Sequence, residues 1–267
     1  MKIRKAYKII VGIILVTAYI VATGIFVKRK YAELTCNSIS IEIDNAHSFV
    51  SNDVVKKILS DGGMVIDSTV KFSEIDFAEI ERLVNENVYV EETQAYGDFK
   101  GNVFVKIKQR APMVRIMTED SASFYLDSRM KVMPLCDYYT ADVMVLSGHL
   151  RSNCFYSSDS VDNYNVNTDK NSLKIDDICK FVDYLQSDEL WSNQIAQVYV
   201  NASNEVELVP RVGNHIILLG ELDSYEKKMN KLEAMYSEGF AISGWNAYSL
   251  INLKYKDQVI CKRRNNG

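Results

Sequence analysis

The residue types most often used for metal or acid–base chemistry are scattered in this 267-residue sequence. His47, His149 and His215 have no Cys, His or Glu at the spacing of zinc ligands, so we expect no zinc site. Glu91 and Glu92 are adjacent in a predicted strand, where neighbouring side chains face opposite sides of the sheet. Catalysis by paired carboxylates is therefore not indicated, and we expect no catalytic residue.

One polar segment resembles a calcium-binding loop, and its alternating side chains are Asn163, Asn165, Asn167 and Asp169. However, Thr168 replaces the glycine of the sharp turn and Lys174 replaces the bidentate glutamate, which favours a solvated loop. The sequence also has no P-loop, G-x-G-x-x-G or G-x-S-x-G motif. We expect no metal, cofactor or small-molecule substrate, although an enzyme whose site is assembled from distant residues stays open.

The first thirty residues differ from the rest in charge. They contain seven Lys and Arg and no acidic residue, whereas the whole chain has a formal net charge of −4. Residues 9–27 are uncharged and, as a helix, would extend about 28 Å, which matches a bilayer core. We expect a transmembrane helix at 9–27 after a cytoplasmic tail at 1–8. A cleaved signal peptide is the alternative, but the apolar run is long and leads into Lys28-Arg29-Lys30 instead of a cleavage site.

The remaining residues are acidic and have no basic patch interleaved with aromatic residues, which argues against a nucleic acid partner. Slightly more positive charge precedes the predicted span than follows it, so we expect a cytoplasmic N-terminus. The protein would then be single-pass in the cytoplasmic (inner) membrane, with its main domains periplasmic or extracytoplasmic. The cysteines are odd in number and show no tight spacing, which favours buried thiols and leaves one disulfide open: Cys36, Cys136, Cys154, Cys179 and Cys261.

Two hydrophobic periods alternate after residue 36, which predicts an α+β fold. The first domain, residues 36–110, has a β-α-α-β-β pattern. A strand near residues 39–43 precedes a helix that follows Ser51, and a second helix is expected after a capping box formed by Ser73 and Asp76. Two strands follow at 88–96 and 102–110.

Arg110 and Pro112 mark the predicted junction, because proline removes a backbone donor and biases Ala111 to an extended conformation. A strand-rich domain with two helices follows at 113–264, interrupted by a polar loop at 152–172. Its helices are expected at 173–186 and 225–238. It would end as a β-hairpin, with strands at 248–255 and 258–262 and a turn at Lys256-Asp257.

The closing hairpin is the best candidate for a partner-binding site. If its last strand lies at a sheet edge, its unpaired backbone groups would accept a strand from another protein. In the other interpretation, the apolar residues complete the core and the basic residues keep the terminus soluble. The candidate partner-binding residues are Trp245, Tyr248, Leu253, Tyr255, Val259, Ile260, Arg263 and Arg264.

Several segments, in this order, resemble the FtsQ/DivIB family. VFVKIKQRAPMVRI (103–116) is similar to a strand followed by an R-x-P junction, and FYLDSRMKVMPL (124–135) is similar to the Y-L-D-x-x-G-x-x-M-P segment. Arg129 replaces the turn glycine of that segment. VMVLSG (143–148), NHIILLGELDSYEKKMNKLEAMY (214–236) and SLINLKY (249–255) resemble later parts of the family's C-terminal domain.

The resemblance implies a POTRA domain at 36–110 and a β-domain after it. It further implies a non-enzymatic scaffold of the bacterial cell-division complex that directs septal peptidoglycan synthesis. The single-span partners FtsB and FtsL would add to the C-terminal edge near Tyr248, Tyr255 and residues 258–264, while the POTRA domain would meet earlier-arriving division proteins. The alternative is a POTRA-bearing component of a transport or secretion apparatus.

Overall fold

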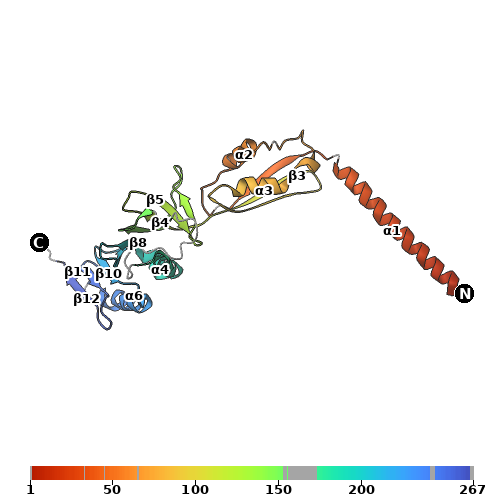
Figure 1. Cartoon of the computed structure of the whole chain (residues 1–267). Coiled ribbons are helices and arrows are strands. Elements are labelled where there is room, and N and C mark those ends of the chain that lie inside the picture. Colours follow the sequence, from red (N-terminus) through yellow and green to blue (C-terminus); the bar gives the residue numbers. More distant parts are fainter. Residues whose placement is uncertain are drawn as a thin grey trace. The chain divides into compact units, whose positions relative to one another are not determined.

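The computed structural model divides the chain into two compact units, residues 1–110 and 111–267 (Figure 1). The residues it describes are 2–32, 34–44, 46–64, 66–152, 155, 173–240 and 244–264, with the side chains of 2–11 and 28–32 left out. The calcium-like segment at 163–169, Cys154 and most of the polar loop predicted at 152–172 lie outside the described residues.

Helix α1 spans Lys2–Ala32 at the start of the first unit. Its residues 12–27 are the part whose side chains are described. Among the described residues, no helix combines the length and the apolar character that crossing a membrane requires. The membrane span predicted over residues 9–27 is therefore not shown, and its first three residues lie outside the described side chains.

The rest of the first unit is a three-stranded sheet with two helices, in the predicted β-α-α-β-β order. The central strand β3 (Asn102–Gln109) pairs in parallel with β1 (Ser38–Ile43) and antiparallel with β2 (Val90–Gly97). Alternate residues of β3 are buried, and helix α3 (Phe77–Asn85) packs on β2. Helix α2 (Asn52–Asp61) contributes Val55 and Leu59 to the same core.

Both helices begin at a residue whose side chain caps the first turn. Ser51 caps α2 as expected, because its side chain accepts a hydrogen bond from the Val54 N–H. The N-cap of α3 is Asp76, whose carboxylate accepts from the Glu79 N–H at 3.1 Å. Ser73 lies in the 3-10 helix η1 (Phe72–Glu74), so the predicted cap at Ser73 is wrong. The short helix turns the chain before the α-helix starts, which moves the cap by one turn.

The second unit is built on one nine-stranded sheet with the order β12-β11-β10-β9-β8-β7-β4-β5-β6. The first strands are β4 (Pro112–Met117), β5 (Ser123–Asp127), β6 (Val132–Pro134) and β7 (Met144–Gly148). The later strands are β8 (Ile195–Val200), β9 (Val206–Pro210), β10 (Ile216–Gly220), β11 (Tyr248–Asn252) and β12 (Ile260–Arg263). The mixed α+β class is thereby confirmed.

Helices cover one face of this sheet. Ile178 and Val182 of α4 (Ile175–Ser187) share a buried core with Ile217 and Ile251 of the sheet. Helix α6 (Tyr225–Ala234) adds Met229 and Leu232 to that core and continues as a π-helix, η4 (Met235–Gly239). A third helix, α5 (Glu189–Gln194), was not expected, because only six residues separate an acidic cap from the next strand.

The closing hairpin has a longer connection than predicted. Strand β11 ends at Asn252 and β12 begins at Ile260, so residues 253–259 form a loop instead of a tight turn at Lys256-Asp257. The side chain of Lys231 is hydrogen-bonded to the backbone of this loop. Lys231 Nζ donates to the carbonyl oxygens of Leu253 at 3.2 Å and Tyr255 at 2.6 Å, just after β11 ends.

Candidate functional site

Strand β12 is at one edge of the nine-stranded sheet. It pairs antiparallel with β11, and among the described residues no strand pairs with its other side. The Arg264 N–H donates to the Ala247 carbonyl at 3.0 Å. Because backbone groups of alternate residues point to opposite sides of a strand, those of Cys261 and Arg263 point away from β11. The edge therefore offers backbone donors and acceptors to an added strand.

Side chains next to this edge are largely exposed. Ile260 is 45% exposed, Tyr255 in the preceding loop is 48% exposed, and Lys262 and Arg263 are exposed. These four positions combine apolar and cationic groups on one short segment, residues 255–263. An added strand would meet an aliphatic contact at Ile260 and positive charge at Arg263.

The sheet face opposite the helices extends this apolar surface. Ile216 of β10 is the register partner of Leu250, and Leu250 is the partner of Lys262, so the three side chains form one row across the strands. Ile216 is 43% exposed. Sequence reasoning missed Ile216 as a surface residue, because β10 is a continuous apolar run in which alternation gives no signal.

Some predicted partner-binding residues lie elsewhere. Leu253 is fully buried in the core, so its side chain is not available to a partner, and Val259 is half-buried against the same core. Trp245 packs on Tyr236 and Phe240, with ring centroids 5.1 Å and 4.8 Å apart. This packing stabilises the end of the hairpin from the side of the core.

Arg264 and His215 lie near Trp245 and also stabilise the fold at the end of the hairpin. The Arg264 guanidinium donates to the Asn214 carbonyl, which ties the end of β12 to the residue before His215. His215 is buried, and its Nε2 lies 3.2 Å from the Tyr236 hydroxyl. Burial lowers the pKa of His215, and the positive charge of Arg264 lowers it further. Arg264 therefore supports the fold as well as contributing charge.

The predicted junction residues occupy ordered positions. Arg110 is buried and closes the first unit, because its Nε donates to Val88 O at 3.1 Å and its Nη2 to Val90 O at 3.0 Å. Pro112 is the first residue of β4 and the register partner of Asp127. The boundary between the two units falls between residues 110 and 111.

The first unit has an exposed sheet face of its own. Tyr96 stacks on Phe104 with ring centroids 5.3 Å apart, and the Lys106 amine lies 5.7 Å from the centre of the Tyr96 ring. Lys106 also pairs with Glu42 at 3.5 Å. This face presents an aromatic pair next to mixed charges, a composition suited to protein contacts.

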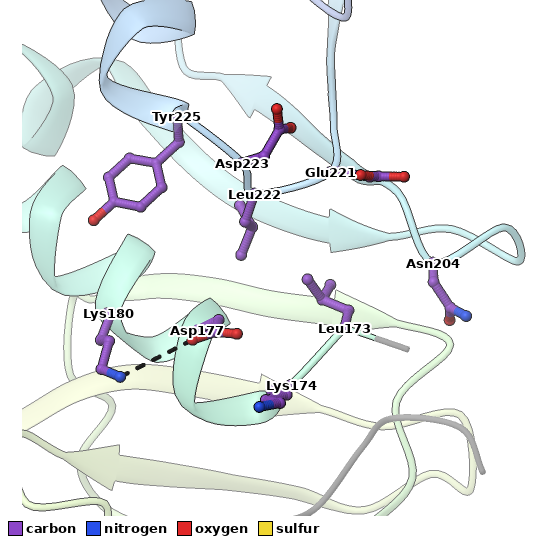
Figure 2. Close-up of a pocket in the computed structure, with 9 residues that line it drawn as sticks. All are labelled: Leu173, Lys174, Asp177, Lys180, Asn204, Glu221, Leu222, Asp223 and Tyr225. Carbon is purple, nitrogen blue, oxygen red and sulfur yellow. Dashed lines mark ion pairs between the residues drawn. The ribbon is translucent and has the colours of Figure 1, made fainter. Parts of the chain in front are cut away.

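A pocket of about 450 Å³ lies in the second unit between α4 and the segment leading into α6 (Figure 2). Figure 2 shows Lys180 and Asp177 on α4, joined by an ion pair of 4.0 Å, with Tyr225 and Leu222 across from them. Burial and the neighbouring Glu226 raise the pKa of Tyr225. As far as the described residues go, no His, Cys or Ser lines this pocket, so it presents no Ser–His or Cys–His pair.

Metal-binding residue types do not gather among the described residues, where no group of three or more His, Cys, Asp or Glu could hold an ion. His149 lies 3.7 Å from Glu119, and the four described cysteines are free thiols. Cys179 is buried, which raises its pKa to about 12. A thiol with that pKa is a packing residue and not a nucleophile at neutral pH.

Each of the two units matches a known family of protein domains. Residues 34–108 match the POTRA-like domain, which agrees with the three-stranded sheet and two helices of the first unit. Residues 111–262 match the family described as FtsQ/DivIB, C-terminal related, and this match includes both β11 and β12. The comparison with curated proteins finds no match. Since the second match covers more than half of the chain, the protein belongs to the FtsQ/DivIB C-terminal related family.

Proposed function

We propose that this protein is a non-enzymatic scaffold of the bacterial cell-division complex that binds an FtsB/FtsL-like single-span partner by strand addition to β12. The observation that carries the proposal is the open edge of the nine-stranded sheet, which lies within the region matched to the family. Through this edge the protein would link early and late division proteins and direct septal peptidoglycan synthesis.

Strand addition draws its affinity from the backbone and its specificity from side chains. Each new backbone hydrogen bond contributes about 0.5–1.5 kcal/mol net, so a short strand alone gives modest affinity. The exposed Ile260 and Tyr255 add apolar contacts, and the Arg263 charge selects among partners. The row formed by Ile216, Leu250 and Lys262 widens the surface that a partner strand or helix could cover.

The same proposal places α1 in the cytoplasmic membrane as a single uncleaved anchor, with the N-terminus in the cytoplasm. The uncharged stretch at 9–27 and the basic residues on both sides of it support this placement. Both units would then lie outside the cytoplasm, where the synthesis of septal peptidoglycan takes place.

The POTRA-like unit would bind other division proteins. Its exposed sheet face offers Tyr96, Phe104 and Lys106, and among the described residues no strand pairs with the outer side of β2, where the Ala95 N–H donates to Glu81. Two separate surfaces, one on each unit, are what a scaffold requires in order to hold two partners at once.

The substitution Cys261→Pro tests whether the partner binds through backbone hydrogen bonds of β12. Cys261→Pro removes an N–H that points away from β11, so it blocks strand addition while leaving the β11–β12 pairing in place. Cys261→Ala is the matched control, because it removes the same side chain and keeps the N–H. We expect the Pro variant of the full-length chain to lose co-purification of small single-span proteins from native membranes and the Ala variant to retain it.

The two variants should have similar unfolding midpoints, which shows that the loss is not a folding defect. Retention of all partners by a folded Cys261→Pro variant would contradict strand addition at this edge. Recovery of an outer-membrane barrel protein as the main partner would favour the transport alternative instead.

A further inference from the structure

Five lysines converge on a pocket of about 290 Å³ in the second unit, between α6 and the loop that connects β11 to β12. This lysine pocket is unusual because the protein outside its first thirty residues is acidic. Asp223 is the one acidic residue among the described residues that line it. The lysines are Lys227, Lys228, Lys231, Lys254 and Lys256.

Two of these lysines are neutralised within the chain. Lys228 is buried and pairs with Asp223 at 2.6 Å, and Lys254 pairs with Glu205. The other three, Lys227, Lys231 and Lys256, form no ion pair with any described carboxylate. Of these three, Lys227 and Lys256 are exposed, whereas Lys231 is half-buried and interacts electrostatically with the nearby Asp257.

Lys231 shows how the pocket holds positive charge in place. Its amine is fixed by donation to the Leu253 and Tyr255 carbonyl oxygens at the pocket wall. Partial burial lowers the pKa of Lys231 and the nearby Lys228 charge lowers it further, and these two effects outweigh the opposite effect of Asp257. An anion bound in the pocket would relieve this repulsion and restore the pKa.

The position of the pocket indicates what kind of anion it takes. Its wall at residues 253–256 belongs to the loop that leads directly into β12 at Ile260. A strand paired with β12 would enter or leave the sheet at this end, within a few residues of the pocket. We propose that the lysine pocket binds the carboxylates of an acidic segment that adjoins the partner strand on β12.

This inference rests on the proposed role of β12 and names the chemistry of the partner: a β-forming segment with Asp or Glu next to it. Several ammonium groups around one pocket, one of them half-buried at Lys231, attract carboxylates more strongly than isolated surface lysines do. A segment lacking these acidic residues would bind the edge strand with lower affinity and slower association.

The test uses the full-length chain in detergent and a fluorescein-labelled hexa-aspartate peptide, with binding followed by fluorescence anisotropy. The variant Lys227→Gln/Lys231→Gln/Lys256→Gln should bind the peptide roughly tenfold more weakly than the unaltered chain. The matched control, Lys56→Gln/Lys57→Gln/Lys100→Gln, removes the same charge from exposed lysines of the first unit and should bind normally.

Equal weakening in both triple variants would overturn the proposal, because it would show that the peptide is attracted by the positive charge of the protein in general and not by the pocket. Since Lys231 also holds the loop, the double variant Lys227→Gln/Lys256→Gln provides a second test, and it should weaken binding by an intermediate amount. Inorganic phosphate is the competitor that distinguishes the source of the anion. If phosphate at a similar concentration displaced the peptide fully, the pocket would be a site for free anions and not for an acidic segment of a partner.

The outcome can be separated from that of the proposed function. Cys261→Pro should leave hexa-aspartate binding unchanged, because the pocket lies before β12 in the chain. If partners are lost in Cys261→Pro but the lysine variants bind the peptide normally, strand addition stands and the pocket assignment fails. If the lysine variants lose the peptide while Cys261→Pro keeps its partners, the pocket stands and strand addition fails.

Discussion

His215 is a buried titratable side chain next to Asn214, whose carbonyl accepts a hydrogen bond from Arg264 at the end of β12. It contacts Tyr236 and Phe240, and its burial and the Arg264 charge lower its pKa despite a hydrogen bond with the Trp245 backbone. The folded state therefore favours neutral His215. The unfolded chain takes up a proton near pH 6.5, so the free energy of unfolding should fall as the pH drops below about 6.5.

This pH dependence is the first prediction. Urea unfolding followed by tryptophan fluorescence reports on the second unit, which contains both Trp191 and Trp245. Between pH 7.5 and pH 5 we expect the loss of stability to be smaller in His215→Gln than in the unaltered chain, since glutamine takes up no proton. His149→Gln, at a half-buried position, should keep the original pH profile; a flat profile in the unaltered chain would contradict the argument.

Arg110 shows how a single residue can complete one unit. Its guanidinium satisfies the carbonyl groups of Val88 and Val90 inside the protein. Arg110→Ala leaves these acceptors without that donor and should destabilise the first unit by about 2 kcal/mol. Hydrogen exchange of the β2 and β3 amides measures this loss, with Lys57→Ala as an exposed control. Unchanged protection in Arg110→Ala would show that these bonds contribute little.

At the scale of elements, the start of α3 can be tested by substitution, because the sequence alone could not show which of Ser73 and Asp76 caps the helix. Asp76→Ala removes the carboxylate that accepts from Glu79 N–H and should cost about 1 kcal/mol. Ser73→Ala, at the position of the predicted capping box, should change stability by less than about 0.5 kcal/mol. Circular dichroism of both variants during urea unfolding gives the comparison. A larger loss in Ser73→Ala would restore the original assignment.

The sequence predicted most elements because their periodicity is local. Alternation in β3 and the apolar stripe of α3 both follow from residues within one element. The edge position of β12 could be stated only as a condition, because strand order depends on pairing between distant residues. The same reason explains why the sequence could not tell that Leu253 is buried and Tyr255 is exposed. Both are hydrophobic residues of the hairpin, and tertiary packing determines which of them lies in the core.

The lysine pocket was invisible at the sequence level for a related reason. Lys227 and Lys231 lie one turn apart on α6, whereas Lys254 and Lys256 come from the loop after β11. In the sequence these are ordinary surface lysines of a helix and a loop. Folding brings them to one pocket, and the backbone carbonyls of Leu253 and Tyr255 hold Lys231 there.

At the scale of the whole molecule, the proposed anchor decides on which side of the membrane both units lie. The uncharged residues 9–27 and the basic residues before them favour export of everything that follows. Alkaline phosphatase fused after Arg264 should therefore be active in intact cells, because this enzyme forms its disulfides only outside the cytoplasm. The same fusion without residues 1–32 should be synthesised but inactive. Activity in both fusions, or in neither, would contradict the proposed placement, and equal amounts of fusion protein on immunoblots are required for the comparison.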